Sequence, residues 1–198
     1  MQSHHPNHYR ARRPLRVGSE GRTCSGITIV EMMIALTVMT VCAYLLSATI
    51  TATMTHDVAG REGAYASDVA RNILEDLRAE SFEDLYALYN GDPTDDPDGE
   101  GTAPGMNFEV PMLDVDVADI DGFVGRILFP GYGPELYEHV DYELLTLPRD
   151  LNGDGWIDGL DHSGDYIILP VCVELQWKGY AGSRTFKLST VMADMEKY

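Results

Sequence analysis

The sequence predicts an α+β protein in which one long N-terminal helix packs on a C-terminal antiparallel β-sheet. Three observations lead to this class. Residues 27–50 form an almost uninterrupted apolar run, no proline occurs between residues 27 and 92, and apolar and polar side chains alternate in several segments after residue 106. A long proline-free stretch of good helix formers favours a helix, and a period of two favours strands with one buried face.

The charges divide the chain into unlike parts. The 198 residues include 14 basic and 32 acidic side chains, a formal charge of −18. Residues 1–26 hold five of the arginines and only one glutamate, so the remainder carries 9 basic and 31 acidic residues, a charge of −22. Such an acidic body argues against binding the phosphate backbone of nucleic acid. Cys42 falls in the apolar run and Cys172 in a predicted strand, so no disulfide framework is indicated.

The apolar run of residues 27–50 is long enough to cross a bilayer, which needs about 20 apolar residues in a helix. The arginines precede it and the acids follow it. Positive charge stays on the cytoplasmic side, so we expect a single-pass protein with a cytoplasmic N-terminus. The run is too long for the apolar core of a secretory signal peptide. The remaining alternative is a buried core helix.

These features define four expected parts of the chain. They are a basic leader (residues 1–26), the transmembrane half of the helix (27–55), its extracytoplasmic half (56–90) and a globular β-rich domain (91–198). In the extracytoplasmic half, five apolar residues fall near helical spacing and predict a stripe that packs on the chain's own domain: Val69, Ile73, Leu74, Leu77 and Leu85.

The C-terminal domain contains several strand-like segments, which are residues 123–129, 166–177 and 184–192. Residues 178–183 hold two glycines and predict the loop of a hairpin that joins the last two strands. Pro170 indicates a bulge or an edge position. Residues 134–146 are compatible with a short helix or with a strand. Residues 91–105 are rich in Asp, Gly and Pro and predict a solvated loop, with cation binding as the alternative.

Glu31 is the one charged residue of the apolar run. A carboxylate inside a bilayer costs about 2.5–3.5 kcal/mol on insertion scales unless it reaches the interface or finds a partner. Two interpretations follow from the physics alone. Glu31 reaches the cytoplasmic edge of the membrane without further function, or it pairs with an amine on another chain during assembly.

The residues around Glu31 resemble a known family. The segment Cys24-Ser25-Gly26 followed by ITIVEMMIAL is similar to the signature of type IV prepilins and type II secretion pseudopilins. The last hairpin, residues 171–193, also resembles that of minor pilins and pseudopilins. The resemblance implies that a prepilin peptidase cuts between Gly26 and Ile27, that Ile27 becomes the new N-terminus at the position that is methylated in the family, and that Glu31 pairs with the amine of Ile27 on a neighbouring subunit.

The resemblance also implies a pilin-like fold and a structural function. The chain would be a minor subunit of a type IV pilus or a type II secretion pseudopilus. Its partners would be the other pilin or pseudopilin subunits, the inner-membrane assembly platform and membrane lipid. It would lie in the bacterial inner membrane with its C-terminal domain in the periplasm before entering the filament. The alternative is an uncleaved single-pass membrane protein that displays a calcium-stabilised binding domain.

Enzymatic function has little support in the sequence. The three histidines after the leader, His56, His139 and His162, do not stand in a metalloprotease motif or beside a nucleophile motif. We therefore do not expect an enzyme.

Residues 150–161, DLNGDGWIDGLD, have the oxygen spacing of a calcium loop. Oxygen-bearing side chains occur at loop positions 1, 3, 5, 9 and 12, a backbone carbonyl at position 7 would add a further ligand, and Gly155 occupies position 6, where the turn is sharp. The predicted ligands are Asp150, Asn152, Asp154, Trp156, Asp158 and Asp161. The loop resembles those of dockerin modules. Ca²⁺ would order it structurally, with His162 and Asp165 as spare ligands, and a solvated turn is the alternative.

Overall fold

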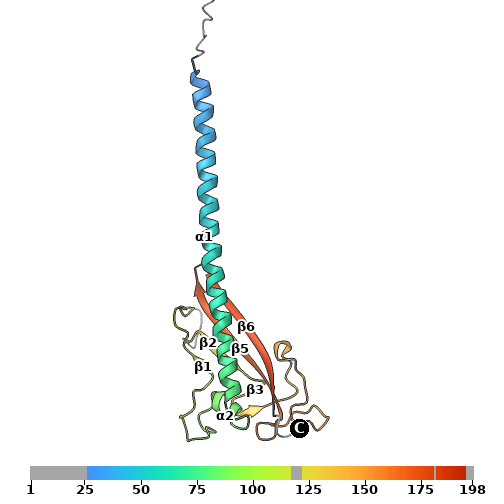
Figure 1. Ribbon diagram of the computed structural model, residues 1–198. Helices are drawn as coiled ribbons and strands as arrows, with labels where there is room; N and C mark the ends of the chain where they lie inside the picture. The colour runs from blue at the N-terminus through green and yellow to red at the C-terminus, as the bar shows by residue number, and fades with distance from the viewer. Residues whose placement is uncertain (1–25, 117–121, 181, 195–198) are drawn as a thin grey trace, which may run out of the picture. The chain divides into compact units, whose positions relative to one another are not determined.

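The computed structural model describes residues 26–116, 122–180 and 182–194. The chain divides into two compact units, Met1–Ser47 and Ala48–Tyr198. The fold is α+β, with one long helix near the N-terminus and an antiparallel sheet at the C-terminus (Figure 1).

The long helix α1 spans Ile29–Ala79, a continuous 51 residues. Thr28 stands at its start, where its carbonyl oxygen accepts the N–H of Met32 at 3.1 Å and its side-chain oxygen accepts the N–H of Glu31 at 3.2 Å. A threonine in this place satisfies donors that the first turn would otherwise leave free. By length and composition, α1 is able to cross a membrane.

The structure differs from the sequence prediction at the end of the helix. We expected a helix to residue 90, but α1 ends at Ala79 and a separate short helix, α2, spans Leu85–Tyr89. The turn between them is held from far along the chain, because the hydroxyl of Tyr166 donates to the carbonyl oxygen of Phe82 at 2.7 Å. The rings of these two residues also lie 5.1 Å apart. Tertiary packing therefore overrides the local helical preference.

The main sheet has four antiparallel strands in the order β1-β2-β5-β6. Its strands are β1 (Asn107–Phe108), β2 (Gly125–Leu128), β5 (Ile168–Gly179) and β6 (Gly182–Ala193). A second, two-stranded sheet pairs β3 (Gly131–Tyr132) with β4 (Glu135–Leu136). The predicted strands near residues 123, 166 and 184 are confirmed as β2, β5 and β6. The hairpin connection is shorter than the predicted loop of residues 178–183, because β5 continues to Gly179 and β6 begins at Gly182.

The structure decides between the alternatives that the sequence left open for three segments. Residues 134–146 contain both kinds of structure, since β4 is followed by the 3₁₀ helix η1 at Glu143–Leu145. Pro170 lies in β5 beyond the last residue that β2 pairs, which is Cys172, so its missing N–H faces an unpaired edge. Residues 91–105 hold turns and bends without helix or strand, as predicted.

The core lies between the sheet and the second half of α1. The predicted stripe is confirmed within α1, with Leu74 and Leu77 buried and Val69 and Ile73 packed against the core. Its last predicted member, Leu85, is also buried but belongs to the separate helix α2. The sheet contributes the alternate residues of β5 that share one face: Leu169, Val171, Val173, Leu175 and Trp177. In Figure 1 the β5–β6 hairpin runs alongside this part of α1. Leu145 of η1 is also buried in the core.

Candidate functional site

The predicted processing and assembly residues lie where α1 begins. Gly26 and Ile27 precede the helix, and Glu31 is in its first turn. Residues 26–54 are all exposed, including Ile29, which is 81% exposed. A helix that is apolar on all sides and exposed requires apolar surroundings, either lipid or other protein chains. Glu31 forms no ion pair with the residues that the structure describes.

The first half of the predicted calcium loop winds around its own side-chain oxygens. The carboxylate of Asp150 accepts the N–H of Gly153 at 2.6 Å on Oδ1 and that of Gly155 at 2.8 Å on Oδ2. Asn152 and Asp154 each accept the N–H two residues ahead, at 3.1 and 2.8 Å. Gly155 has φ = +89°, a conformation that favours glycine and explains this residue at position 6.

The second half of the loop turns its carboxylates toward other segments. Asp158 Oδ1 accepts the N–H of Leu160 at 2.8 Å, and this hydrogen bond is the main cause that lowers the pKa of Asp158. Asp161 Oδ1 accepts the N–H of Leu136 in β4 and that of Ser163, each at 3.0 Å. Burial alone would raise the pKa of Asp161, but these hydrogen bonds outweigh burial and hold it below its usual value. Asp161 therefore fastens the loop to β4.

A buried carboxylate that the sequence did not identify lies beneath this loop. Glu138 is 1% exposed and follows β4. Its Oε1 accepts the N–H of Leu151 at 2.5 Å and that of Asn152 at 3.2 Å, and its Oε2 accepts the N–H of Asp158 at 3.4 Å. No sequence signal distinguishes Glu138 from the exposed acids around it, because its burial depends on a loop 13 or more residues further along the chain.

His162 completes a compact cluster with Glu138 and Asp158. Its Nε2 lies 3.2 Å from Asp158 Oδ1 and 3.7 Å from Glu138 Oε2, and its Nδ1 lies 3.1 Å from Asp165 Oδ1. The ligand atoms of Glu138, Asp158 and His162 all lie within 4.8 Å of one another. Burial alone would lower the pKa of His162, but its hydrogen bonds to the two aspartates and the charge of Glu138 raise it.

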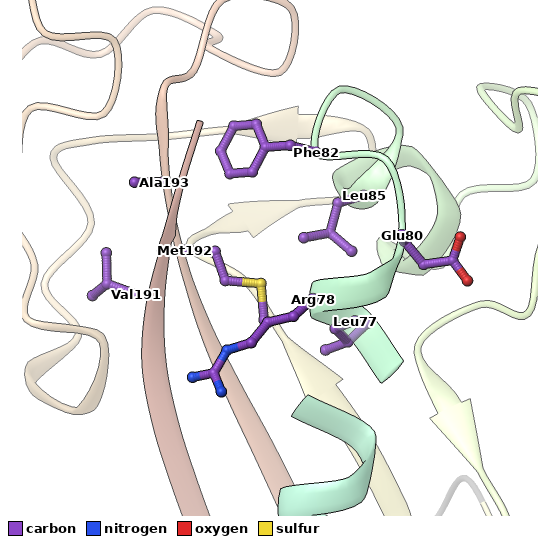
Figure 2. A pocket seen from close by; sticks show the side chains of 8 residues that line it. All are labelled: Leu77, Arg78, Glu80, Phe82, Leu85, Val191, Met192 and Ala193. Carbon is purple, nitrogen blue, oxygen red and sulfur yellow. The ribbon is translucent and has the colours of Figure 1, made fainter. Parts of the chain in front are cut away.

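A separate groove lies where α1 ends beside β6. It encloses about 290 Å³ and is lined mainly by apolar side chains, among them Leu77, Phe82 and Met192. Figure 2 shows the guanidinium of Arg78 and the carboxylate of Glu80 at this groove, pointing away from each other. Arg78 donates to Thr190 Oγ1 at 3.2 Å. The lining thus places no acid beside a base, and we assign this groove no role.

Comparisons of the chain with family models, with curated proteins and with solved structures find no match.

Proposed function

We propose that this protein is a structural subunit, present as a minor component, of a type IV pilus or a type II secretion pseudopilus. The observation that carries the proposal is the juxtaposition of Gly26-Ile27 with Glu31 at the start of an exposed apolar helix. In this mechanism a prepilin peptidase removes residues 1–26. The new helix then joins others in the membrane and in the filament.

The position of Glu31 supports an assembly role on energetic grounds. Residues 29–50 of α1 extend about 33 Å at 1.5 Å per residue, which matches a bilayer core of about 30 Å. A carboxylate within this segment is costly unless it reaches the interface or an amine compensates it. A free N-terminus at Ile27 of a neighbouring subunit would provide such a partner without any basic residue in the helix.

The charge of the body supports a minor role. After residue 26 the chain carries −22, and no basic residue occurs between Arg78 and Arg126, where 13 acidic residues stand. Charges repel across about 8–10 Å at physiological salt. A filament made only of this subunit would bring many such surfaces together, whereas dispersal among other subunits separates them.

The first test is processing. The full chain, produced in membranes with and without a prepilin peptidase, is analysed by intact mass and N-terminal sequencing. We expect an N-terminus at Ile27 only when the peptidase is active. An intact leader in the presence of active peptidase would contradict the proposal and favour an uncleaved membrane protein.

The second test separates the charge of Glu31 from its place in the helix. We expect Glu31→Gln and Glu31→Ala to be processed normally but to reduce incorporation into sheared filaments at least tenfold. Thr28→Val is the matched control, because it removes the side chain that accepts the Glu31 N–H and keeps the carboxylate. Equal losses in Thr28→Val and Glu31→Gln would indicate that only the helix start matters.

We also propose that Ca²⁺ orders the loop of residues 150–161. The donor set fits, since carboxylate, amide and backbone oxygens are the ligands that Ca²⁺ takes, and the oxygens of Asp150, Asn152 and Asp154 already organise the loop backbone. The ion would neutralise the mutual repulsion of the carboxylates. Chelation should lower the unfolding temperature of the full chain in detergent, and Asp154→Asn should remove this difference. Asp98→Asn in the loop of residues 91–105 is the control and should leave it unchanged.

A further inference from the structure

We propose that Glu138, Asp158 and His162 form a largely buried site for a transition-metal dication of the zinc class, which shares only Asp158 with the predicted ligands of the calcium loop. The proposal goes beyond the filament function and does not depend on it. It concerns three ligand atoms from two segments, one directly after β4 and one in the loop that precedes β5.

The spacing of the ligand atoms fits such an ion. Zinc ligands stand about 2.0–2.2 Å from the metal in a tetrahedron, so neighbouring ligand atoms lie about 3.4 Å apart. The imidazole Nε2 of His162 lies 3.2 Å from Asp158 Oδ1 and 3.7 Å from Glu138 Oε2. Two of the three separations are thus close to those of a tetrahedral ion, the third is no more than 4.8 Å, and a water molecule would complete the coordination.

The charge balance of the cluster also calls for a cation. Glu138 is 1% exposed and His162 is 3% exposed, so neither group is solvated. Among the described residues, His162 is the one basic side chain within ion-pair distance of Glu138. A buried carboxylate is costly without a positive partner. A dication would neutralise both Glu138 and Asp158, which one imidazolium does only in part.

The surroundings of His162 match those of a metal-bound histidine. Its Nδ1 lies 3.1 Å from Asp165 Oδ1, so an N–H on Nδ1 would point to a carboxylate. Metal-ligating histidines commonly donate their second ring nitrogen in this way, which leaves Nε2 unprotonated toward the ion. The backbone N–H of His162 also donates to the carbonyl oxygen of Leu136 at 2.9 Å and fixes the residue beside β4.

The donor set separates this site from the calcium loop. Ca²⁺ takes six to eight oxygen ligands, whereas an imidazole nitrogen with two carboxylates suits zinc and its neighbours. Asp158 is the residue that both predictions use. In calcium loops the ninth position often acts through a water molecule, so a direct bond from Asp158 to the buried ion leaves the other loop ligands in place.

The test uses the full chain in detergent after removal of metals with a chelator. Zn²⁺ alone is titrated against a chromophoric chelator, and Co²⁺ reports tetrahedral coordination through its visible absorption. We expect one tight Zn²⁺ site that a large excess of Ca²⁺ does not displace. His162→Gln and Asp158→Asn should each weaken Zn²⁺ binding at least 100-fold and abolish the Co²⁺ spectrum.

Matched variants keep the result interpretable. Asp154→Asn, in the calcium loop but outside the cluster, should weaken Ca²⁺ binding and leave Zn²⁺ binding within twofold of wild type. Asp165→Asn should weaken Zn²⁺ binding about 10–100-fold, as expected for a group that orients a ligand. Glu138→Gln is used only if its circular dichroism matches wild type, because Glu138 also holds three backbone N–H groups. The absence of a Zn²⁺ site in the wild-type chain, or Zn²⁺ binding that survives both His162→Gln and Asp158→Asn, would overturn the proposal.

Discussion

The two halves of α1 place their apolar side chains in opposite environments. Residues 29–54 are exposed and carry apolar side chains on all sides of the helix, whereas the second half buries a single stripe that begins at Ala59 and ends at Leu77. A striped helix needs one partner surface, and here the β5–β6 sheet provides it. A helix that is apolar all round needs partners on every side.

Replacing a leucine with alanine in each half of α1 should give very different losses of stability. Leu77→Ala should lower the free energy of unfolding of the C-terminal unit by about 2–5 kcal/mol, because Leu77 is 1% exposed and its loss leaves a cavity. Leu46→Ala, at a position 63% exposed, should change it by less than about 0.5 kcal/mol. Urea unfolding of the full chain in detergent, followed by the fluorescence of Trp177 in a Trp156→Phe background, measures both. Similar changes in the free energy of unfolding at the two positions would contradict the distinction between the two halves of α1.

A smaller loss of stability is expected from a substitution that acts at the C-terminal end of α1. The hydroxyl of Tyr166 donates to the carbonyl oxygen of Phe82 at 2.7 Å and accepts the N–H of Tyr86 at 3.4 Å, so it fastens the turn between α1 and α2. Tyr166→Phe should lower the free energy of unfolding by about 0.5–1.5 kcal/mol through the lost hydrogen bond. Tyr180→Phe, at a position 72% exposed, is the control and should have little effect.

Because of Tyr166, we also expect the free energy of unfolding to fall at alkaline pH. Burial is the main cause that raises the pKa of Tyr166 from 10.0 to about 12, opposed by the hydrogen bond from Tyr86. A raised pKa means that the folded state binds the proton more tightly, so this contribution is complete below pH 10 and is lost as the pH rises toward about 12. Urea unfolding between pH 8 and 11 should show a decline that is less steep in Tyr166→Phe. Identical slopes for wild type and variant would show that Tyr166 is not the responsible group.

The sequence predicts those parts of the fold that depend on local pattern. The start of α1, its apolar stripe and the β5–β6 hairpin follow from runs of 10 or more residues whose periodicity is visible without the structure. The end of α1 does not follow in this way, because Tyr166 acts on Phe82 from 84 residues away.

The candidate metal-binding residues also show that sequence patterns reveal local features but not contacts between distant segments. The loop of residues 150–161 is identifiable because its oxygens recur at short fixed intervals. Glu138 is not identifiable, since it lies in a segment whose neighbours include exposed acids such as Glu135. Only the fold brings it against Asp158, 20 residues away, and His162. A site that combines distant segments needs the tertiary structure to be recognised.

The smallest predicted effect concerns the place where the environment of α1 changes. Glu62 lies close to the first buried residue of the helix, Ala59, and accepts hydrogen bonds from Trp177 Nε1 and from the N–H of Tyr180, both at 3.4 Å. Because these bonds are long, Glu62→Ala should cost only about 0.5 kcal/mol of global stability. Its local effect should be clearer, as faster amide hydrogen exchange at residues 177–180, with Asp68→Ala as the exposed control.

Exchange at residues 171–175 provides the internal reference for this measurement. These residues lie in the middle of β5, where β2 and β6 flank most of them, and they should exchange only through global unfolding. Faster exchange confined to the end of the hairpin would show that Glu62 supports only the residues it contacts there. Faster exchange along the whole of β5 would mean instead that Glu62 supports the entire sheet, and it would contradict a local role for this residue.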